Sequence, residues 1–204
     1  MTAGTVSREH LAEHAHDPSR GQQVGVILLI TADAAFVLSL AFTYFYLRGL
    51  NTDNGWIPPG SHTLSPANGW IIAAVVVLSA LAYRWGDLGI QAANQRRLMT
   101  GTALAMLLLL ADLGLQIWRM TSMPFGAGTG SYASTVLVMA GAHVVHLLIT
   151  ALLGVAILNR ARRGLISGNA NWHVRLVGYW WYWVATSAVL IAFTTSFVAS
   201  PHVG

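Results

Sequence analysis

The sequence predicts an all-α integral membrane protein, a bundle of five transmembrane helices. Of the 204 residues, 55% are hydrophobic and only 9% carry a charge, and the mean hydropathy is +0.57. In a soluble globular domain about a quarter of the residues are charged. The apolar residues are also concentrated in five segments, each close to the roughly 20 residues that a helix needs to cross the hydrocarbon core of a bilayer.

In chain order, the spans are predicted at residues 24–47, 66–85, 98–118, 132–158 and 176–198. They form one domain, residues 24–204, behind a polar tail at residues 1–23. The tail has no short apolar core with a small-residue cleavage site, so we expect the first span to act as its own insertion signal. The second span has the shortest apolar run, but Ser65 and Pro66 precede it as a favourable N-cap and first helical residue.

Aromatic side chains mark the ends of these spans. Trp and Tyr are enriched at the two membrane–water interfaces. The residues that fall near predicted span ends are Trp56, Trp70, Trp85, Trp118, Tyr132 and Trp172. We therefore expect them to form interfacial belts.

The arginines predict the orientation of the chain. All eleven basic residues are Arg, and nine of them lie in the tail or the loops on one side, against Arg48 and Arg119 on the other. The positive-inside rule then predicts a cytoplasmic N-terminus and a C-terminus outside. Because the arginines lie in short loops between apolar spans, they are topology signals and not a nucleic-acid patch, although the sequence pI is near 10.

The fourth span is the most informative, because polar residues follow one of its faces. They recur at steps of three and four, the spacing that places side chains on one helical face. The residues are Tyr132, Thr135, Met139, His143, His146, Thr150 and Gly154. Lipid cannot satisfy polar groups, so this face is expected to point into the bundle. His143 and His146 are the candidate functional residues on it.

Two aspartates lie inside the predicted spans. Asp33 is close to mid-membrane, where a carboxyl costs roughly 2.5–3.5 kcal/mol on the insertion scale and so should face protein or water. Two interpretations stay open for it: a proton-handling or lipid-contacting group, or a hydrogen-bonding group that sets helix packing. For Asp112, in the third span, we favour a structural hydrogen bond.

The sequence contains few side chains that could bind a metal or haem cofactor. Cysteine is absent, which excludes thiolate metal sites and disulfides. A b-type haem between helices needs one His from each of two helices, whereas the histidines outside the fourth span fall in the tail or in predicted loops. His143 and His146 can share a metal only with ligands from elsewhere. We expect them to hydrogen-bond neighbouring helices instead.

Two further patterns are interpreted without a catalytic role. Residues 10–14 match the H-x-x-E-H pattern of some zinc proteases, but they lie in the short polar tail and the match is attributed to chance. Residues 179–183, YWWYW, stand at the start of the fifth span. We interpret them as an interfacial belt and helix packing rather than as a quinone site.

Several segments together resemble subunit III of the haem–copper oxidases, in a short five-helix form without the first two helices of the longer version. Residues 131–154 resemble that family's S-x-Y-G-S-x-F…G-F-H-x-x-H-V helix. Asp33 stands at the family's intramembrane glutamate, at the same distance from Arg48. Residues 55–60, GWIPPG, are similar to its W-P-P-x-G loop, and residues 179–184 to its Y-W-H-F-V-D segment.

The chain departs from that family's pattern at a few positions. Tyr182 and Ala185 stand where the family has His and Asp, and Asp33 replaces a glutamate. A second glutamate, near the end of the third span, has no clear counterpart, although Gln116 lies near its place. These changes indicate a divergent branch.

The resemblance implies a non-catalytic subunit of a respiratory terminal oxidase in the bacterial cytoplasmic membrane. Such a subunit packs against the catalytic subunit I, holds phospholipid in a cleft between its helices, and supports proton uptake and complex stability. It carries no cofactor of its own, and haem and copper belong to its partner subunits. Asp33, His143 and His146 would then be polar positions inside the bundle near the lipid cleft.

Three alternatives remain at this point. The same motifs are found in the subunit-III-like accessory protein of nitric oxide reductases. A small proton-coupled transporter would use Asp33 and the histidine face as a path, although the spans show no inverted repeat. An independent haem or metal oxidoreductase is disfavoured by the ligand count. The electron donor, cytochrome c or quinol, depends on other subunits.

Overall fold

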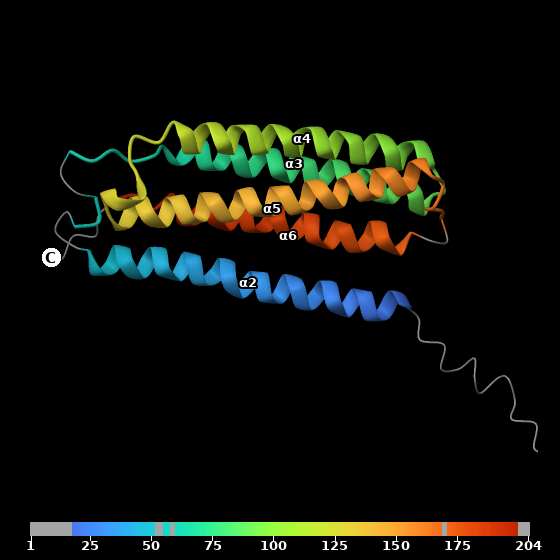
Figure 1. Cartoon of the computed structure of the whole chain (residues 1–204), viewed down its shortest axis with the longest axis horizontal. Helices are drawn as coiled ribbons and strands as arrows, with labels where there is room; N and C mark the ends of the chain where they lie inside the picture. The colour runs from blue at the N-terminus through green and yellow to red at the C-terminus, as the bar shows by residue number, and fades with distance from the viewer. Residues whose placement is uncertain (1–17, 52–54, 58–59, 169–170, 200–204) are drawn as a thin grey trace, which may run out of the picture.

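Five long helices lie side by side in the computed structural model of this chain, which describes residues 18–51, 55–57, 60–168 and 171–199 (Figure 1). They are α2 (Pro18–Leu50), α3 (Pro66–Gln91), α4 (Gln95–Thr121), α5 (Ser131–Arg162) and α6 (Trp172–Thr194). A short 3-10 turn, η1 (Ala127–Thr129), precedes α5. All five are long and apolar enough to cross a membrane, which confirms the all-helical prediction.

The helix ends differ from the predicted span ends. α2 already begins at Pro18, whereas the polar tail was predicted to run to residue 23. The rest of that tail, with the H-x-x-E-H pattern, lies outside the described residues. α6 begins at Trp172 and ends at Thr194, four residues before the predicted end, and it includes His173, which was predicted in a loop. Hydropathy locates the apolar part of a span, but backbone hydrogen bonding continues into the polar interface and sets the helix end.

Four of the helices form a closed bundle. α3 packs against α4 and α6, and α5 packs against the same two helices, so α3 and α5 lie diagonally opposite each other. Among the helices, α2 contacts only α5 and α6, and it runs along the outside of that pair (Figure 1). Only 6% of the most apolar stretch of α2 is buried inside the protein, against 39–44% of the corresponding stretch in the other four helices. The main core therefore lies between α3, α4, α5 and α6.

α3 and α4 are joined by a three-residue turn, much shorter than the predicted loop between residues 85 and 98. Asn94 caps α4, because its side chain accepts a hydrogen bond from the backbone N–H of Arg97 at 3.0 Å. The helices approach closely where Gly86 faces Gly101. A Cβ atom added at Gly101 would lie 2.6 Å from the Cα atom of Gly86. Small residues at this crossing allow the two backbones to touch, as in many membrane helix pairs.

We expect the Gly101→Ala variant to be less stable than the wild type by about 1–3 kcal/mol, because its methyl group meets the backbone of α3 and forces the helices apart. The matched control is Gly114→Ala on the same helix, where an added Cβ meets nothing within 4 Å. Thermal unfolding in a mild detergent compares the two. Equal melting temperatures for both variants would show that the close approach of α3 and α4 is not needed for stability.

The loop after α2 folds back onto the bundle through Trp56. Its ring is fully buried between Tyr44 of α2 and Tyr132 of α5, with ring centroids 4.9 and 5.6 Å away in edge-to-face geometry. The Tyr132 hydroxyl accepts a hydrogen bond from the backbone N–H of Leu64 at 3.0 Å. Trp56 and Tyr132 were predicted to belong to an interfacial belt, but a closed loop covers both rings, so they pack inside the protein. Trp70, Trp85 and Trp118 are exposed, as the side chains of such a belt would be, and their position in a belt stays a prediction.

Candidate functional site

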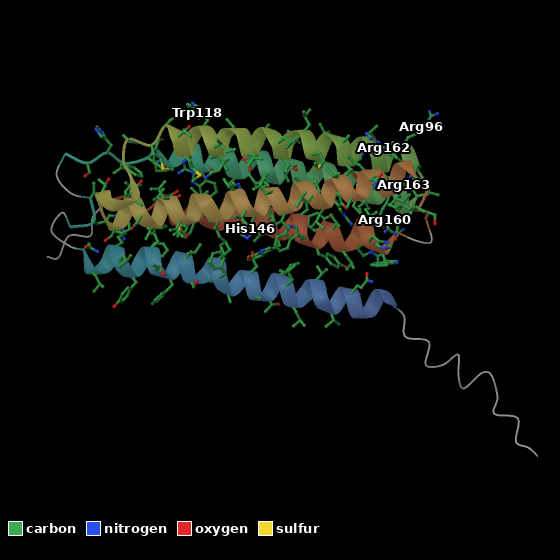
Figure 2. The ribbon with its side chains drawn as sticks, in the orientation of Figure 1. Arg96, Trp118, His146, Arg160, Arg162 and Arg163 are labelled. Atoms are coloured by element: carbon green, nitrogen blue, oxygen red, sulfur yellow. The ribbon has the colours of Figure 1, made fainter. Side chains whose placement is uncertain are left out.

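The polar face predicted for the fourth span points into the bundle. All seven residues of the predicted stripe are buried on α5, and the side chains of His143 and His146 are only 3% and 4% exposed. His146 lies about midway along the bundle (Figure 2). Because the two histidines are three residues apart, their rings diverge toward different neighbouring helices. Each ring meets one of the two intramembrane aspartates.

His143 reaches across to α4. Its Nε2 atom lies 2.9 Å from Oδ2 of Asp112, and both side chains are almost completely excluded from solvent and lipid. Asp112 was predicted to make a structural hydrogen bond, and His143 is its partner. The pair joins α4 to α5 in the middle of the bundle, where a lost hydrogen bond cannot be replaced by water.

His146 reaches in the other direction, to α2. Its Nε2 atom lies 2.9–3.0 Å from the carboxyl oxygens of Asp33. Trp183 of α6 donates its indole N–H to Oδ2 of Asp33 at 2.6 Å. Asp33 therefore accepts hydrogen bonds at a junction of three helices, provided that Nε2 of His146 carries its proton. With 17% of its side chain exposed, it is the more accessible of the two intramembrane aspartates.

The aromatic segment at the start of α6 belongs to the core more than to the interface. Trp180 donates its indole N–H to the hydroxyl of Thr150 at 3.0 Å. Trp181 is fully buried, stacks on Tyr83 with a ring-centroid distance of 4.5 Å, and donates to Ser79 at 2.9 Å. Both tryptophans thus take part in the predicted helix packing, and neither ring is available to a lipid-facing belt.

Several polar atoms of the site have no partner among the described residues. They include Nδ1 of both histidines and Oδ1 of Asp112. His143 also lines an interhelical cavity, together with Gln116, Arg119 and Thr195. The cavity is mostly apolar but has room for a water molecule, and these four polar side chains supply the partners that a buried water needs. The ring nitrogens and carboxyl oxygens of the site can therefore bind a proton or hydrogen-bond a water molecule inside the bundle.

A shared metal ion does not fit the positions of these side chains. His143 and His146 contact different aspartates on different helices, α4 and α2. Within the described part of the chain, no group of three His, Cys, Asp or Glu side chains is placed to bind one metal ion.

Sequence reasoning did not find Trp183 as a partner of Asp33, although the two residues are joined by the shortest hydrogen bond of the site. It also missed the ion pair of the buried Asp87 with the half-exposed Arg84, at 2.9 Å on α3. The aromatic run at residues 179–183 was a signal for packing, but nothing in it identified which tryptophan would meet an acid. That depends on how α6 is rotated against α2.

The fold and the site define a class: an all-helical membrane protein in which two buried histidines of one helix each pair with an aspartate of a neighbouring helix. Comparison with known sequences narrows this class. The sequence model of the family described as "Cytochrome c oxidase subunit III" matches residues 4–198. The chain therefore belongs to the cytochrome c oxidase subunit III family.

Individual relatives agree with the family match. The chain is 27% identical to the probable cytochrome c oxidase subunit 3 of Rickettsia felis, over 95% of its own length and 74% of the relative's. It is 26% identical to the protein of the same description from Rickettsia conorii, over 95% and 73%. It is also 27% identical to cytochrome c oxidase subunit 3 of the fish Danio rerio, over 87% and 70%.

Proposed function

We propose that this chain is the non-catalytic subunit III of a respiratory haem–copper terminal oxidase and packs against the catalytic subunit I. The observation that carries the proposal is the family match over residues 4–198, nearly the whole chain. The names of the relatives assign them to the same subunit of cytochrome c oxidase. In this proposal haem and copper reside in the partner subunits, and oxygen reduction and proton translocation are activities of the whole complex.

The proposed membrane is the bacterial cytoplasmic membrane, with the N-terminus inside and the C-terminus outside. The distribution of arginines supports this orientation. Arg96, Arg160, Arg162 and Arg163 gather at one end of the bundle, and Trp118 lies at the other end (Figure 2). Cytoplasmic ends of membrane proteins are enriched in Lys and Arg. The four arginines would thus face the cytoplasm.

Within this function, the two aspartate–histidine pairs have different proposed roles. The pair of His143 with Asp112 is almost completely buried and holds α4 against α5. Asp33 is partly exposed where α2, α5 and α6 meet. Asp33 and His146 are therefore the pair that can contact a bound phospholipid or exchange a proton in support of proton uptake by the complex.

Affinity purification of the tagged chain from its native membrane, in a mild detergent, tests the proposed function. We expect a large haem-bearing subunit and copper in the eluate, seen by mass spectrometry, metal analysis and a reduced-minus-oxidised spectrum. A partner with non-haem iron and b- and c-type haems would instead assign the chain to a nitric oxide reductase. A chain that elutes alone, colourless and folded, would contradict both assignments and favour a transporter.

A further inference from the structure

Arg119 near the end of α4 is a buried cation without a protein partner. The residue is only 9% exposed, and its Nε atom is completely enclosed. Among the described residues, no side chain or backbone oxygen makes a hydrogen bond with its guanidinium. The other arginine on this side of the predicted topology, Arg48, donates its Nε–H to the carbonyl of Ala199 at 2.9 Å. Arg119 thus differs from Arg48 in lacking an acceptor.

The acids that the structure describes are all engaged elsewhere. Asp33 contacts His146 and Trp183, and Asp112 contacts His143. Asp87 contacts Arg84 on α3. Asp112 is the nearest acid along α4, but seven residues of helix separate it from Arg119, a rise of about 10 Å. A buried charge is strongly unfavourable unless an opposite charge or several hydrogen bonds accompany it. A water molecule in the cavity that Arg119 shares with His143 would be neutral, so the guanidinium still lacks a counter-anion among the described residues.

The position of that anion is indicated by a groove on the outer surface of the bundle, between the start of α3 and the end of α4. The groove is lined by Asn68, Ile71, Ile72, Leu115, Trp118 and Arg119. Its walls are apolar, and the side chains at its rim are exposed: Ile71 by 55% and Trp118 by 62%. Arg119 supplies its only charge, and Asn68 supplies an amide. A groove with one cation at its inner wall and apolar sides fits an amphiphile with an acidic head.

We propose that this groove binds an anionic phospholipid from the membrane leaflet at the α4 C-terminal end. The phosphate accepts hydrogen bonds from the guanidinium of Arg119, whose planar donors match phosphate oxygens. An acyl chain packs along Ile71 and Leu115. Trp118 lies at the depth of the headgroups, as interfacial tryptophans do. The site offers no carboxylate to a choline or ethanolamine ammonium, so lipids with a net negative charge are preferred.

This site is separate from the one that surrounds Asp33. α2 contacts only α5 and α6, whereas the groove lies between α3 and α4 on the opposite side of the bundle (Figure 1). The inference therefore goes beyond the proposed function. It would hold for any complex in which this face of the chain meets lipid.

Native mass spectrometry of the full-length chain in a mild detergent tests the site. Dioleoyl phosphatidylglycerol and dioleoyl phosphatidylcholine are added separately, at equal concentrations. We expect the wild type to retain phosphatidylglycerol at least several-fold more strongly. Arg119→Gln should weaken that retention by about tenfold or more, because a charge-assisted hydrogen bond is lost. Arg119→Lys should fall between the two, since it keeps the charge but not the planar fork.

The matched control is Arg162→Gln. It removes the same charge from an exposed position in the last turn of α5, at the other end of the bundle (Figure 2). Phosphatidylglycerol retention should be unchanged in this variant. An equal loss in Arg119→Gln and Arg162→Gln would show general attraction to a basic protein and would overturn the proposal. Equal retention of both lipids by the wild type would do the same.

Two further arms distinguish other occupants and guard against misfolding. Millimolar inorganic phosphate should not displace the lipid; displacement would show a site for free phosphate instead. If Arg119→Gln leaves lipid retention intact but loses the partner subunits, the anion is a carboxylate of a partner protein, and the lipid proposal is overturned.

The Ile71→Trp variant keeps Arg119 and fills the groove from an exposed position. A folded Ile71→Trp variant that binds phosphatidylglycerol like the wild type would also contradict the proposed groove.

Discussion

Replacing His143 by leucine is expected to lower the free energy of unfolding of the bundle by about 1–3 kcal/mol or more, the usual effect of leaving a buried polar group without its hydrogen-bond partner. Asp112 would keep its carboxyl in the core, 0% exposed, without the ring nitrogen that now lies 2.9 Å away. The described residues around it supply no second donor, because its other oxygen already lacks a partner. Thermal unfolding in detergent, followed by circular dichroism, measures the loss.

A double-mutant cycle separates the interaction energy between His143 and Asp112 from the effect of replacing either residue alone. The variant with leucine at both His143 and Asp112 should recover much of the lost stability, because no buried polar group is left unpaired. Asp112→Leu alone should be less harmful than His143→Leu, since it leaves an imidazole ring and not a carboxyl in the core. His62→Leu, at an exposed loop position, is the control for loss of a histidine. A double variant as unstable as His143→Leu would show that the pair is not coupled.

Replacing Asp33 by leucine is expected to release the middle of α2 from the bundle. α2 has two anchors: the aromatic contacts around Tyr44 and Trp56 at one end, and the hydrogen bonds of Asp33 with His146 and Trp183. The variant leaves two buried donors unpaired, at about 1–3 kcal/mol each. Because so little of α2 is buried, packing cannot offset the loss. Hydrogen exchange within α2 should rise by one to two orders of magnitude.

The Asp33→Asn variant tests which charge state the junction needs. One amide oxygen can accept from only one of the two nitrogens in good geometry, and the amide N–H groups would face the other donor. We expect exchange in α2 to rise in Asp33→Asn, though less than in Asp33→Leu, and some loss of the chain from the complex. Ser39→Ala is the control, because that hydroxyl bonds only to its own helix, at the carbonyl of Phe36. Wild-type behaviour of Asp33→Asn would show that a neutral group suffices there.

Much of the fold was predictable because it follows from local properties of the chain. The mostly apolar segment at residues 132–158 is long enough to cross a membrane as a helix. The few polar residues within it recur with the helical period. All seven residues of that stripe are buried. Asp33 and Asp112 were likewise expected to face protein, because lipid excludes their carboxyl groups. The five helices and the buried face of α5 need no knowledge of their neighbours.

The helix ends and the short turn between α3 and α4 were less predictable. Residues 86–91 and 95–97 are polar enough to read as a loop, yet they extend both helices beyond the apolar spans. Trp56 was expected at the interface for a similar reason. A tryptophan between apolar and polar segments suits either an interface or a core, and only the closure of the loop onto Tyr44 and Tyr132 decides between them.

By itself, the sequence determined that this chain has five apolar helices, that α5 buries two histidines, and that two aspartates must find partners within the membrane. Only the tertiary structure decided which partners these are. His143 meets Asp112, 31 residues away, while Asp33 meets His146 and Trp183, 113 and 150 residues away. Helical periodicity places a side chain on a face, but the rotation and neighbours of each helix come from packing all five together. The unpartnered Arg119 belongs to the same category: its charge was visible in the sequence, and its lack of an acceptor was not.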